Sequence, residues 1–450
     1  MTFCALSSAK GMDIKMYRMS KCVHIVKNNE IVVAFNDYNF KVIDLDKDLY
    51  SVVERIEGIE ESIVENTEEL RYLLDNKFLV KKDEDELEKR QQKREFIRQR
   101  IMKEGVTSKI GYLRISLTEQ CNLRCKYCFV NDIVDKSSNI TEELFCKAVE
   151  MLIQNSRNPR IQYFGGEPLL RMELIELGHE ILNAAKKKGQ IDSFIEEIVT
   201  NGTLLTKDKI DFFVNNEMGL IFSVDGWKEI HDKNRVDIYG KGSFNTVIEK
   251  FQAFIESGGK AEIIITPNKD NIELLDQITQ FFVETYDLKK VSINAPQPNE
   301  KGWDIDGKTL AEKIINIYLY CEKHDILLSA PGMNLVQNLL KKRYQIFSCV
   351  NYGTLKHRKW GMYLLGTGKI SYCNVECSEN SEEWFNNFNI GRKIDQWHMK
   401  NNYSEECLTC LAYSVCGGPC SMEREMIKNV EIMHNKCAFN KKIVEWALTR

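Results

Sequence analysis

Two regimes of hydrophobic patterning divide this chain of 450 residues. From residue 110 onward, short apolar runs alternate with stretches in which apolar residues recur three and four positions apart. The runs predict strands at 112–117, 160–164, 194–200, 219–224, 261–265 and 290–294. The periodic stretches predict helices near 141–155, 170–187, 206–216, 244–257, 271–285 and 308–324. Repeated strand-helix units predict an α/β fold with a parallel sheet, curled as a partial (β/α)6 TIM barrel.

The first eighty residues follow a different pattern, which predicts a small α+β domain. β-branched runs indicate strands at 23–26, 31–35 and 40–45, and Asn28-Asn29 between the first two predicts a hairpin turn. Helical patterns follow at 47–55 and 66–75, and residues 78–80 are expected to return as a strand.

Residues 81–104 contain closely balanced acids and bases with few apolar side chains, which predicts a solvated helical linker. The expected domains are therefore residues 1–84, a charged helical linker at 85–108, the partial barrel at 109–330 and a C-terminal domain at 331–450.

Overall composition excludes several classes of protein. Apolar residues make up 43% of the chain and charged residues 28%, as in globular proteins. A net charge of -4 gives no reason to expect nucleic-acid binding, which favours a basic face. The sequence has no apolar run of membrane-spanning length and no secretory segment near Met1, so a cytoplasmic protein is expected.

Cysteine usage points to metal. The chain has 15 cysteines, and in a reducing compartment such a number favours metal sites over disulfides. Cys4, Cys22, Cys146 and Cys321 are scattered singly and are expected to be buried apolar side chains. The other eleven lie in two fields, one at 121–128 and one at 349–437.

The first field follows the first barrel strand and contains Cys121, Cys125 and Cys128 within eight residues. Thiolates suit iron-sulfur clusters and zinc, and three of them on one tight loop can surround one small inorganic core. A 4Fe-4S cube held by three cysteines keeps one iron open to a chelating cofactor. The alternative, a zinc knuckle, needs a fourth ligand that this stretch does not supply.

This loop, with the aromatic Tyr127 beside its last cysteine, resembles that of radical S-adenosylmethionine enzymes. The resemblance implies that the amino and carboxylate groups of S-adenosylmethionine chelate the open iron. It also implies that an electron cleaves the sulfonium to a 5'-deoxyadenosyl radical, which abstracts hydrogen. An external one-electron donor such as flavodoxin or ferredoxin is expected as a partner.

Further motifs end the next three strands, on the rim where barrel chemistry is usually found. By resemblance, Gly165, Gly166, Glu167 and Pro168 form the motif that contacts the methionine amino group. Ser223 and Asp225 would bond the ribose hydroxyls, and Arg235 would pair with the methionine carboxylate. Asn201, after the third strand, is also expected to bind the cofactor.

The C-terminal field resembles the twin auxiliary-cluster (SPASM) domain of radical enzymes that mature peptides, sulfatases and quinone cofactors. The resemblance implies one 4Fe-4S cluster distal to the radical site, held by Cys407, Cys410, Cys416 and Cys437. A proximal cluster would use Cys349, Cys373 and Cys420, with Cys377 as a fourth ligand or an open iron in its place. Two zinc sites are the alternative. With the first field, three 4Fe-4S clusters are expected.

The substrate expected is a ribosomally made precursor peptide that receives a side-chain crosslink, thioether or carbon-carbon. Sulfatase maturases carry an aspartate as base where this chain has Asn374, which favours a peptide over a sulfatase. The N-terminal domain resembles the modules that bind leader peptides as an added strand; a domain that only packs against the enzyme is the alternative. Maturation of a sulfatase or enzyme subunit, or a non-catalytic iron-sulfur peptide-binding role, are the competing functions.

Overall fold

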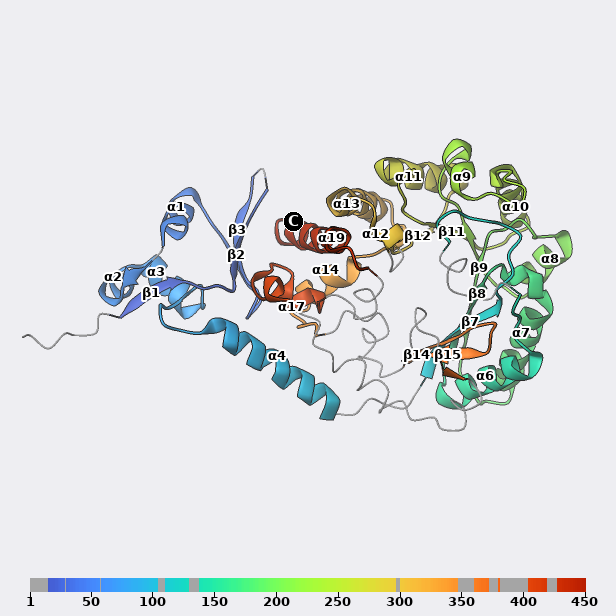
Figure 1. The fold of residues 1–450 in the computed structure, drawn as a ribbon, viewed down its shortest axis with the longest axis horizontal. Helices are drawn as coiled ribbons and strands as arrows, with labels where there is room; N and C mark the ends of the chain where they lie inside the picture. The colour runs from blue at the N-terminus through green and yellow to red at the C-terminus, as the bar shows by residue number, and fades with distance from the viewer. Residues whose placement is uncertain are drawn as a thin grey trace, which may run out of the picture.

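The computed structural model describes residues 15–28, 30–56, 58–103, 110–128, 137–296, 300–346, 360–371, 379–380, 404–418 and 427–450. Figure 1 shows small N-terminal sheets at one end of the molecule and a curved sheet flanked by helices at the other. The C-terminal helices lie between these two parts. No helix in the described ranges is both long enough and apolar enough to cross a membrane.

A ten-stranded sheet forms the large domain, in the order β13-β12-β11-β10-β9-β8-β7-β14-β15-β16. The strands from β7 to β13 are parallel. Their bounds are β7 Ile110–Thr118, β8 Arg160–Gly165, β9 Ile195–Thr200, β10 Leu220–Ser223, β11 Ala261–Ile265, β12 Lys290–Ile293 and β13 Leu327–Ser329. The six expected barrel strands are thus confirmed.

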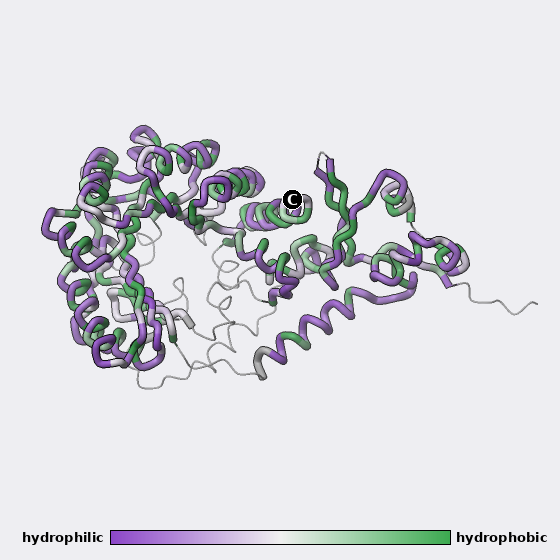
Figure 2. The backbone as a smooth tube through the Cα atoms, turned by 180° about the vertical axis from the view of Figure 1, so that it is seen from behind, coloured by the Kyte–Doolittle hydropathy of each residue, from purple (hydrophilic) through white to green (hydrophobic). Residues whose placement is uncertain are grey.

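Most of the helices between these strands lie on the outer side of the curved sheet, whereas α12 lies beside the C-terminal helix α19, Val430–Leu448 (Figure 1). The helices between the strands are α6 Glu142–Asn155, α7 Met172–Lys187, α8 Lys207–Asn215, α9 Lys228–Asn234, α10 Phe244–Glu256, α11 Leu275–Tyr286, α12 Glu300–Trp303 and α13 Gly307–Lys323, with the short 3-10 turns η1 Pro168–Arg171 and η2 Ile272–Leu274. The expected cap of α6 is present, because the Thr141 side chain accepts a hydrogen bond from the Leu144 backbone N–H. Figure 2 shows hydrophobic and hydrophilic segments alternating along the outer helices, as expected of amphipathic helices that pack on a sheet.

Four strands extend the sheet beyond the expected six parallel ones. β13 is only three residues long, which is too short to produce a periodic signal. β14 (Trp360–Leu364) comes from the C-terminal part of the chain and pairs in parallel with β7. β15 (Lys369–Ser371) and β16 (Glu379–Asn380) follow in antiparallel pairing. The C-terminal part therefore continues the sheet that carries the first cysteine loop.

The N-terminal domain contains two three-stranded sheets, in the orders β5-β1-β6 and β2-β3-β4. The expected strands and helices are present as β2 Val23–Lys27, β3 Val32–Asn36, β4 Lys41–Asp44, α1 Lys47–Arg55, α3 Glu68–Asp75 and β6 Leu79–Lys81. The sequence pattern did not predict β1 Met16–Met19, β5 Ile59–Glu60 or α2 Glu61–Asn66. The hairpin between β2 and β3 is confirmed, although Asn29 of its turn lies outside the described residues.

Strand β3 joins two hydrophobic cores through its alternating side chains. Val33 and Phe35 belong to the large core that the barrel and the C-terminal helices share. Ala34, between them, belongs to the smaller core under the N-terminal helices. Since successive side chains of a strand point to opposite faces, the β2-β3-β4 sheet is packed on both sides.

The linker predicted at 85–108 contains α4, Glu86–Lys103. Figure 2 shows this helix as largely hydrophilic, in agreement with its charge pattern. One side of it is nevertheless buried, which corrects the expectation of a solvated helix: Glu86 is 7% exposed and Arg90 is fully buried. Ionic partners on other elements, absent from the local pattern, explain this burial.

Helices close the C-terminal part of the structure. They are α14 Met333–Leu340, η4 Glu405–Thr409, α17 Tyr413–Cys416 and α19 Val430–Leu448. The long helix α19 packs against α13, α14 and β2, so it touches the barrel, its own domain and the N-terminal domain. Phe439, Ile443, Val444 and Leu448 are its buried apolar side chains in the shared core.

Candidate active site

The first cysteine loop leaves the C-terminal end of β7 and is hydrogen-bonded to the end of α9 and to the chain directly after it. The Arg124 backbone N–H donates to the Val236 carbonyl at 2.6 Å, and that of Lys126 donates to the Asn234 carbonyl at 3.0 Å. Cys121, Cys125 and Cys128 are all partly buried. Hydrogen bonds of its backbone therefore hold the loop that carries the three thiols.

Burial raises the pKa of two of these thiols. The pKa of Cys121 is raised to about 12 by burial and then by the nearby negative charge of Glu167. Burial raises the pKa of Cys125 to about 11, against the opposing positive charge of Arg235. Thiols packed together in this way become thiolates when a cation binds them, and this donor set fits an iron-sulfur cluster.

The Gly-Gly pair at the end of β8 lies directly against the cysteine loop. The Gly166 N–H donates to the Thr118 carbonyl at 2.8 Å, and the Glu167 N–H donates to the Gln120 carbonyl at 2.8 Å. A Cβ atom on Gly166 would lie 1.9 Å from the Gln120 oxygen. Only glycine permits this close approach. In the part of the chain that the structure describes, the backbone of Gly166 therefore packs against the first cysteine loop.

Glu167 is 1% exposed and links the ends of β8 and β9. Its Oε1 accepts from the Thr200 hydroxyl at 2.6 Å, and its Oε2 accepts from the Asn201 N–H at 2.8 Å. Burial raises the pKa of the carboxyl, and these hydrogen bonds oppose the rise. Pro168, also buried, begins η1 directly after it. Glu167 therefore fixes two adjacent strand ends of the rim.

Asn201 directly follows β9, and its side chain points toward Cys121. Its Nδ2 is 3.7 Å from the Cys121 sulfur and 3.0 Å from Oδ1 of Asn122. Its Oδ1 accepts from the Thr203 N–H at 3.0 Å. The sequence suggested a cofactor contact here; the structure places an amide donor against a candidate cluster ligand.

Asp225, Arg235 and Tyr127 form one buried network. Arg235 Nε lies 2.8 Å from Oδ2 of Asp225, and its Nη2 lies 3.3 Å from Oδ1. The Tyr127 hydroxyl donates to the same Oδ2. Burial raises the pKa of Tyr127 well above its usual range, so the phenol keeps the proton that it donates. Ser223 is the last residue of β10 and is partly buried.

A pocket in the C-terminal domain brings together the four cysteines expected to hold the distal cluster. Cys407, Cys410, Cys416 and Cys437 line it with Lys436 and Asn440. Asn440 Nδ2 donates to the Cys416 sulfur at 3.2 Å. Burial raises the pKa of Cys416 to about 12. Among the described residues, no three Cys, His, Asp or Glu side chains are arranged to hold a single metal ion.

The candidate proximal ligands Cys349, Cys373, Cys377 and Cys420, and also Asn374, lie outside the described residues. One residue that the sequence reasoning missed is Glu119, directly before the first loop. Its Oε1 accepts from the Gly366 N–H at 2.9 Å, which ties the loop to the turn between β14 and β15. A carboxylate two residues before the first cysteine was the only sequence signal for it.

Comparisons with known proteins agree with this geometry. Residues 115–282 match the family model described as Radical SAM superfamily. The cysteine-type anaerobic sulfatase-maturating enzyme of Clostridium novyi (strain NT) is 34% identical over 176 residues. That alignment covers 37% of this chain and 46% of that enzyme, so the match spans less than half of the relative.

Two solved structures are similar in fold. Native anSMEcpe with bound AdoMet has a TM-score of 0.59 and 19% identity, covering 75% of this chain and 96% of that one. Streptococcus suis SuiB bound to precursor peptide SuiA has a TM-score of 0.53 and 16% identity, covering 90% and 96%. The match to the family model covers the strands that carry the first cysteine loop and the rim motifs. Residues 115–282 of this chain therefore form a domain of the radical SAM superfamily.

Proposed function

We propose that this protein is a radical S-adenosylmethionine peptide maturase that abstracts hydrogen from a ribosomally made precursor peptide and installs a side-chain crosslink, thioether or carbon-carbon. The observation that carries the proposal is the joining of a barrel with a three-cysteine loop to a small domain with an exposed edge strand. The first part suits radical chemistry, and the second suits the capture of an extended chain.

Cys121, Cys125 and Cys128 would hold the first 4Fe-4S cluster. When bound, this cluster and S-adenosylmethionine together supply a hydrogen-abstracting radical, with the electron coming from an external donor such as flavodoxin or ferredoxin. The Asn201 amide donates toward the Cys121 sulfur, and hydrogen bonds to ligand sulfurs are one means by which proteins tune such clusters.

Other rim residues would position the cofactor. Arg235 can offer its guanidinium to the methionine carboxylate, and Asp225 and Tyr127 fix its orientation. Glu167 is occupied by Thr200 and Asn201, so its contribution is to hold the two strand ends. Ser223 would bond the ribose from the end of β10.

The four-cysteine pocket fits the proposed distal auxiliary cluster. Its ligands come from η4, the loop after it, α17 and α19, and Lys436 lies at its wall. Lysines 436 and 441 oppose the burial that raises the pKa of Cys437, as expected of cations near thiolates. The proximal cluster on Cys349, Cys373 and Cys420, completed by Cys377 or left open, stays a prediction.

The candidate peptide-binding edge is β4. Within the described residues this strand pairs only with β3, so its other edge is available. Val42 on it is 45% exposed, although its neighbour Ile43 is buried. The match to SuiB covers 90% of the chain, whereas residues from 110 onward make up only about three quarters of it. That match must include part of the N-terminal domain.

Isothermal titration with the precursor peptide tests this function. The peptide is taken from a short reading frame beside the gene. Val42→Glu, which places a charge on the edge, is expected to weaken peptide binding by roughly tenfold or more, and Ile63→Glu on α2 is the matched control because Ile63 is also exposed. Reductive cleavage of S-adenosylmethionine should be unchanged in both variants. Equal peptide affinity in all three proteins would reduce the N-terminal domain to a packing role.

Maturation of a sulfatase remains the second candidate, because the C. novyi relative is a sulfatase-maturating enzyme. The two functions separate in one assay. The enzyme is incubated without oxygen with the precursor or with a sulfatase-derived cysteine peptide, and the masses of the products are measured by mass spectrometry. Loss of two hydrogens from the precursor supports crosslinking; conversion of the sulfatase peptide alone would establish the alternative.

A further inference from the structure

Arg90 of α4 lies where the N-terminal domain, the linker helix and the four-cysteine pocket meet. Its guanidinium is fully buried and pairs with Oδ2 of Asp37, in the turn between β3 and β4. Nη1 of Arg90 donates to the Leu408 carbonyl. Leu408 is within η4, between Cys407 and Cys410. One side chain thus connects the N-terminal domain to the backbone that presents two cysteines.

An aromatic ring completes this contact. The Arg90 guanidinium lies 3.9 Å from the ring centroid of Tyr413, which follows Cys410 and begins α17. Stacking of this kind fixes the plane of the guanidinium fork. The Tyr413 N–H also donates to the Cys410 carbonyl at 3.0 Å, so the residue that carries the ring is hydrogen-bonded to the Cys407–Cys410 loop.

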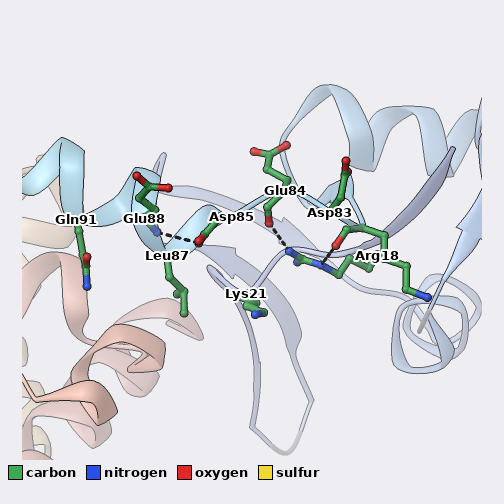
Figure 3. A pocket seen from close by; sticks show the side chains of 9 residues that line it. Arg18, Lys21, Asp83, Glu84, Asp85, Leu87, Glu88 and Gln91 are labelled. Carbon is green, nitrogen blue, oxygen red and sulfur yellow. Dashed lines mark hydrogen bonds between the residues drawn. The ribbon is translucent and has the colours of Figure 1, made fainter.

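The start of α4 is clamped to the N-terminal domain. Arg18 on β1 donates to Oε2 of Glu86 at 2.7 Å and to the Glu84 carbonyl at 2.7 Å, as Figure 3 shows for Glu84. The Lys21 backbone N–H donates to Glu86 at 2.9 Å. Arg90 is one helical turn beyond Glu86. Asp37 and Arg90 therefore belong to one packed unit, and Arg90 links this unit to the Cys407–Cys410 loop.

Stability alone gives a poor account of this arrangement. Replacing a buried ion pair with apolar side chains is often neutral or stabilising. Within the described residues, Oδ1 of Asp37 and Nε of Arg90 also lack hydrogen-bond partners, which adds to the cost. His24 lies beside the pair, with its Nε2 3.1 Å from Oδ2 of Asp37.

The charge of Arg90 reaches the pocket. Its guanidinium donates to the Leu408 carbonyl, between Cys407 and Cys410, and stacks on the ring of Tyr413, so the cation lies against the backbone that carries two of the four cysteines. Near a cluster, a positive charge favours the reduced and more negative state, and a negative charge disfavours it. Arg90 and Asp37 should therefore act with opposite sign on any cluster in this pocket.

We propose that Arg90 is a positioning residue that makes the distal auxiliary site depend on the docked N-terminal domain: it holds the Cys407–Cys410 loop through the Leu408 carbonyl, and with Asp37 it sets the reduction potential of the cluster. The proposal rests on the proposed function, because it requires a cluster on the four cysteines.

Redox titration of the reconstituted full chain, followed by electron paramagnetic resonance, tests the proposal. Cys407→Ser identifies the distal signal by its loss. Arg90→Met should move that signal to a more negative potential, and Asp37→Asn should move it to a more positive one. The double variant should return toward the parent value. Lys89→Met, an exposed cation on the same helix, should leave the potential unchanged.

Iron retention gives an independent readout. Arg90→Met is expected to weaken iron binding at the distal site by roughly ten- to a hundredfold, measured as loss to a chelator. Arg90→Lys keeps the charge but not the fork, so it should keep the potential near the parent value and still lose iron faster. This variant also decides the matter if Arg90→Met fails to fold.

The two kinds of failure differ. If the distal signal is present and both single variants leave its potential and its iron retention unchanged, or shift the potential in the same direction, the role of Arg90 is wrong and the cluster assignment stands. If Cys407→Ser removes no signal and no iron from the parent protein, the distal cluster itself is absent, and the inference fails with it.

Discussion

The guanidinium of Arg235 lies 2.8 Å from the carboxylate of Asp225, and neither side chain is exposed to solvent to any great extent. Asp225 is fully buried and also accepts from Tyr127 and from the Thr266 N–H. The carboxylate thus joins three segments of the rim: the cysteine loop, the chain after α9 and the chain after β11.

Removing the charge of Asp225 should destabilise the barrel. Asp225→Asn leaves Arg235 buried without its counter-ion, and breaking such a pair costs about 3 to 5 kcal/mol. The midpoint of denaturant unfolding of the cluster-free chain measures the effect. Asp192→Asn, which breaks the exposed pair with Arg157, is the control and should cost less than about 1 kcal/mol. An equal loss of unfolding free energy in the two variants would mean that the buried pair contributes no more to stability than the exposed one.

Adding one methyl group at Gly166 should displace the cysteine loop. In Gly166→Ala the new Cβ would overlap the Gln120 carbonyl, which is backbone and cannot rotate away. We expect loss of iron from the first site, measured as iron and sulfide per chain after anaerobic reconstitution. Gly58→Ala is the control, since its Cβ would meet Met16 Cε at an ordinary 3.4 Å. Full iron content in Gly166→Ala would show that the loop can shift without consequence.

The first cysteine field alone should support cleavage of S-adenosylmethionine. Cys125→Ala is expected to abolish formation of 5'-deoxyadenosine, measured by liquid chromatography with dithionite as reductant. Cys146→Ala, a partly buried cysteine on α6, should retain the parent rate. A parent rate in Cys125→Ala would refute the assignment of the loop.

His231 should make stability depend on pH. Burial, and after it the positive charge of Arg235, lowers the pKa of His231 to about 4. In the unfolded chain this pKa is about 6.5. Between these values the unfolded state binds a proton that the folded state does not, so stability is fully present above about pH 6.5 and falls as the pH drops toward 4.

His231→Gln tests this dependence. The variant should show a flatter loss of thermal stability between pH 6.5 and 4 than the parent, with the cluster-free chain used for both. His434→Gln, at an exposed position, should follow the parent curve. Parallel curves for His231→Gln and the parent would show that His231 does not titrate differently in the folded state.

The sequence predicted the barrel well because each strand-helix unit has its own periodic signal. It also predicted that Cys121, Gly166, Asn201 and Asp225 would meet, since the carboxyl ends of parallel strands share one edge. The four cysteines of the distal set do line one pocket. Whether they bind a cluster stays a prediction, as do the ligands outside the described residues.

What the sequence did not predict depends on partners far along the chain. A buried Arg90 and an exposed Lys89 are indistinguishable in a charged helical pattern, because the difference lies in Asp37 and Leu408. The carboxyl of Glu167 was expected to face a ligand, and its bonds to Thr200 and Asn201 follow only from the adjacency of β8 and β9. The pairing of β14 with β7 gave no local signal either.

The pairing of β14 with β7 also limits how early the sheet can be completed during synthesis on the ribosome. β7 carries the first cysteine loop, but its second neighbour, β14, is encoded some 250 residues later. At about 5 to 20 residues per second, the edge of β7 waits on the order of ten seconds or more for its partner. An unpaired edge strand invites association with other chains. Insertion of iron and sulfide into the loop before β14 arrives would therefore compete with aggregation of the nascent chain.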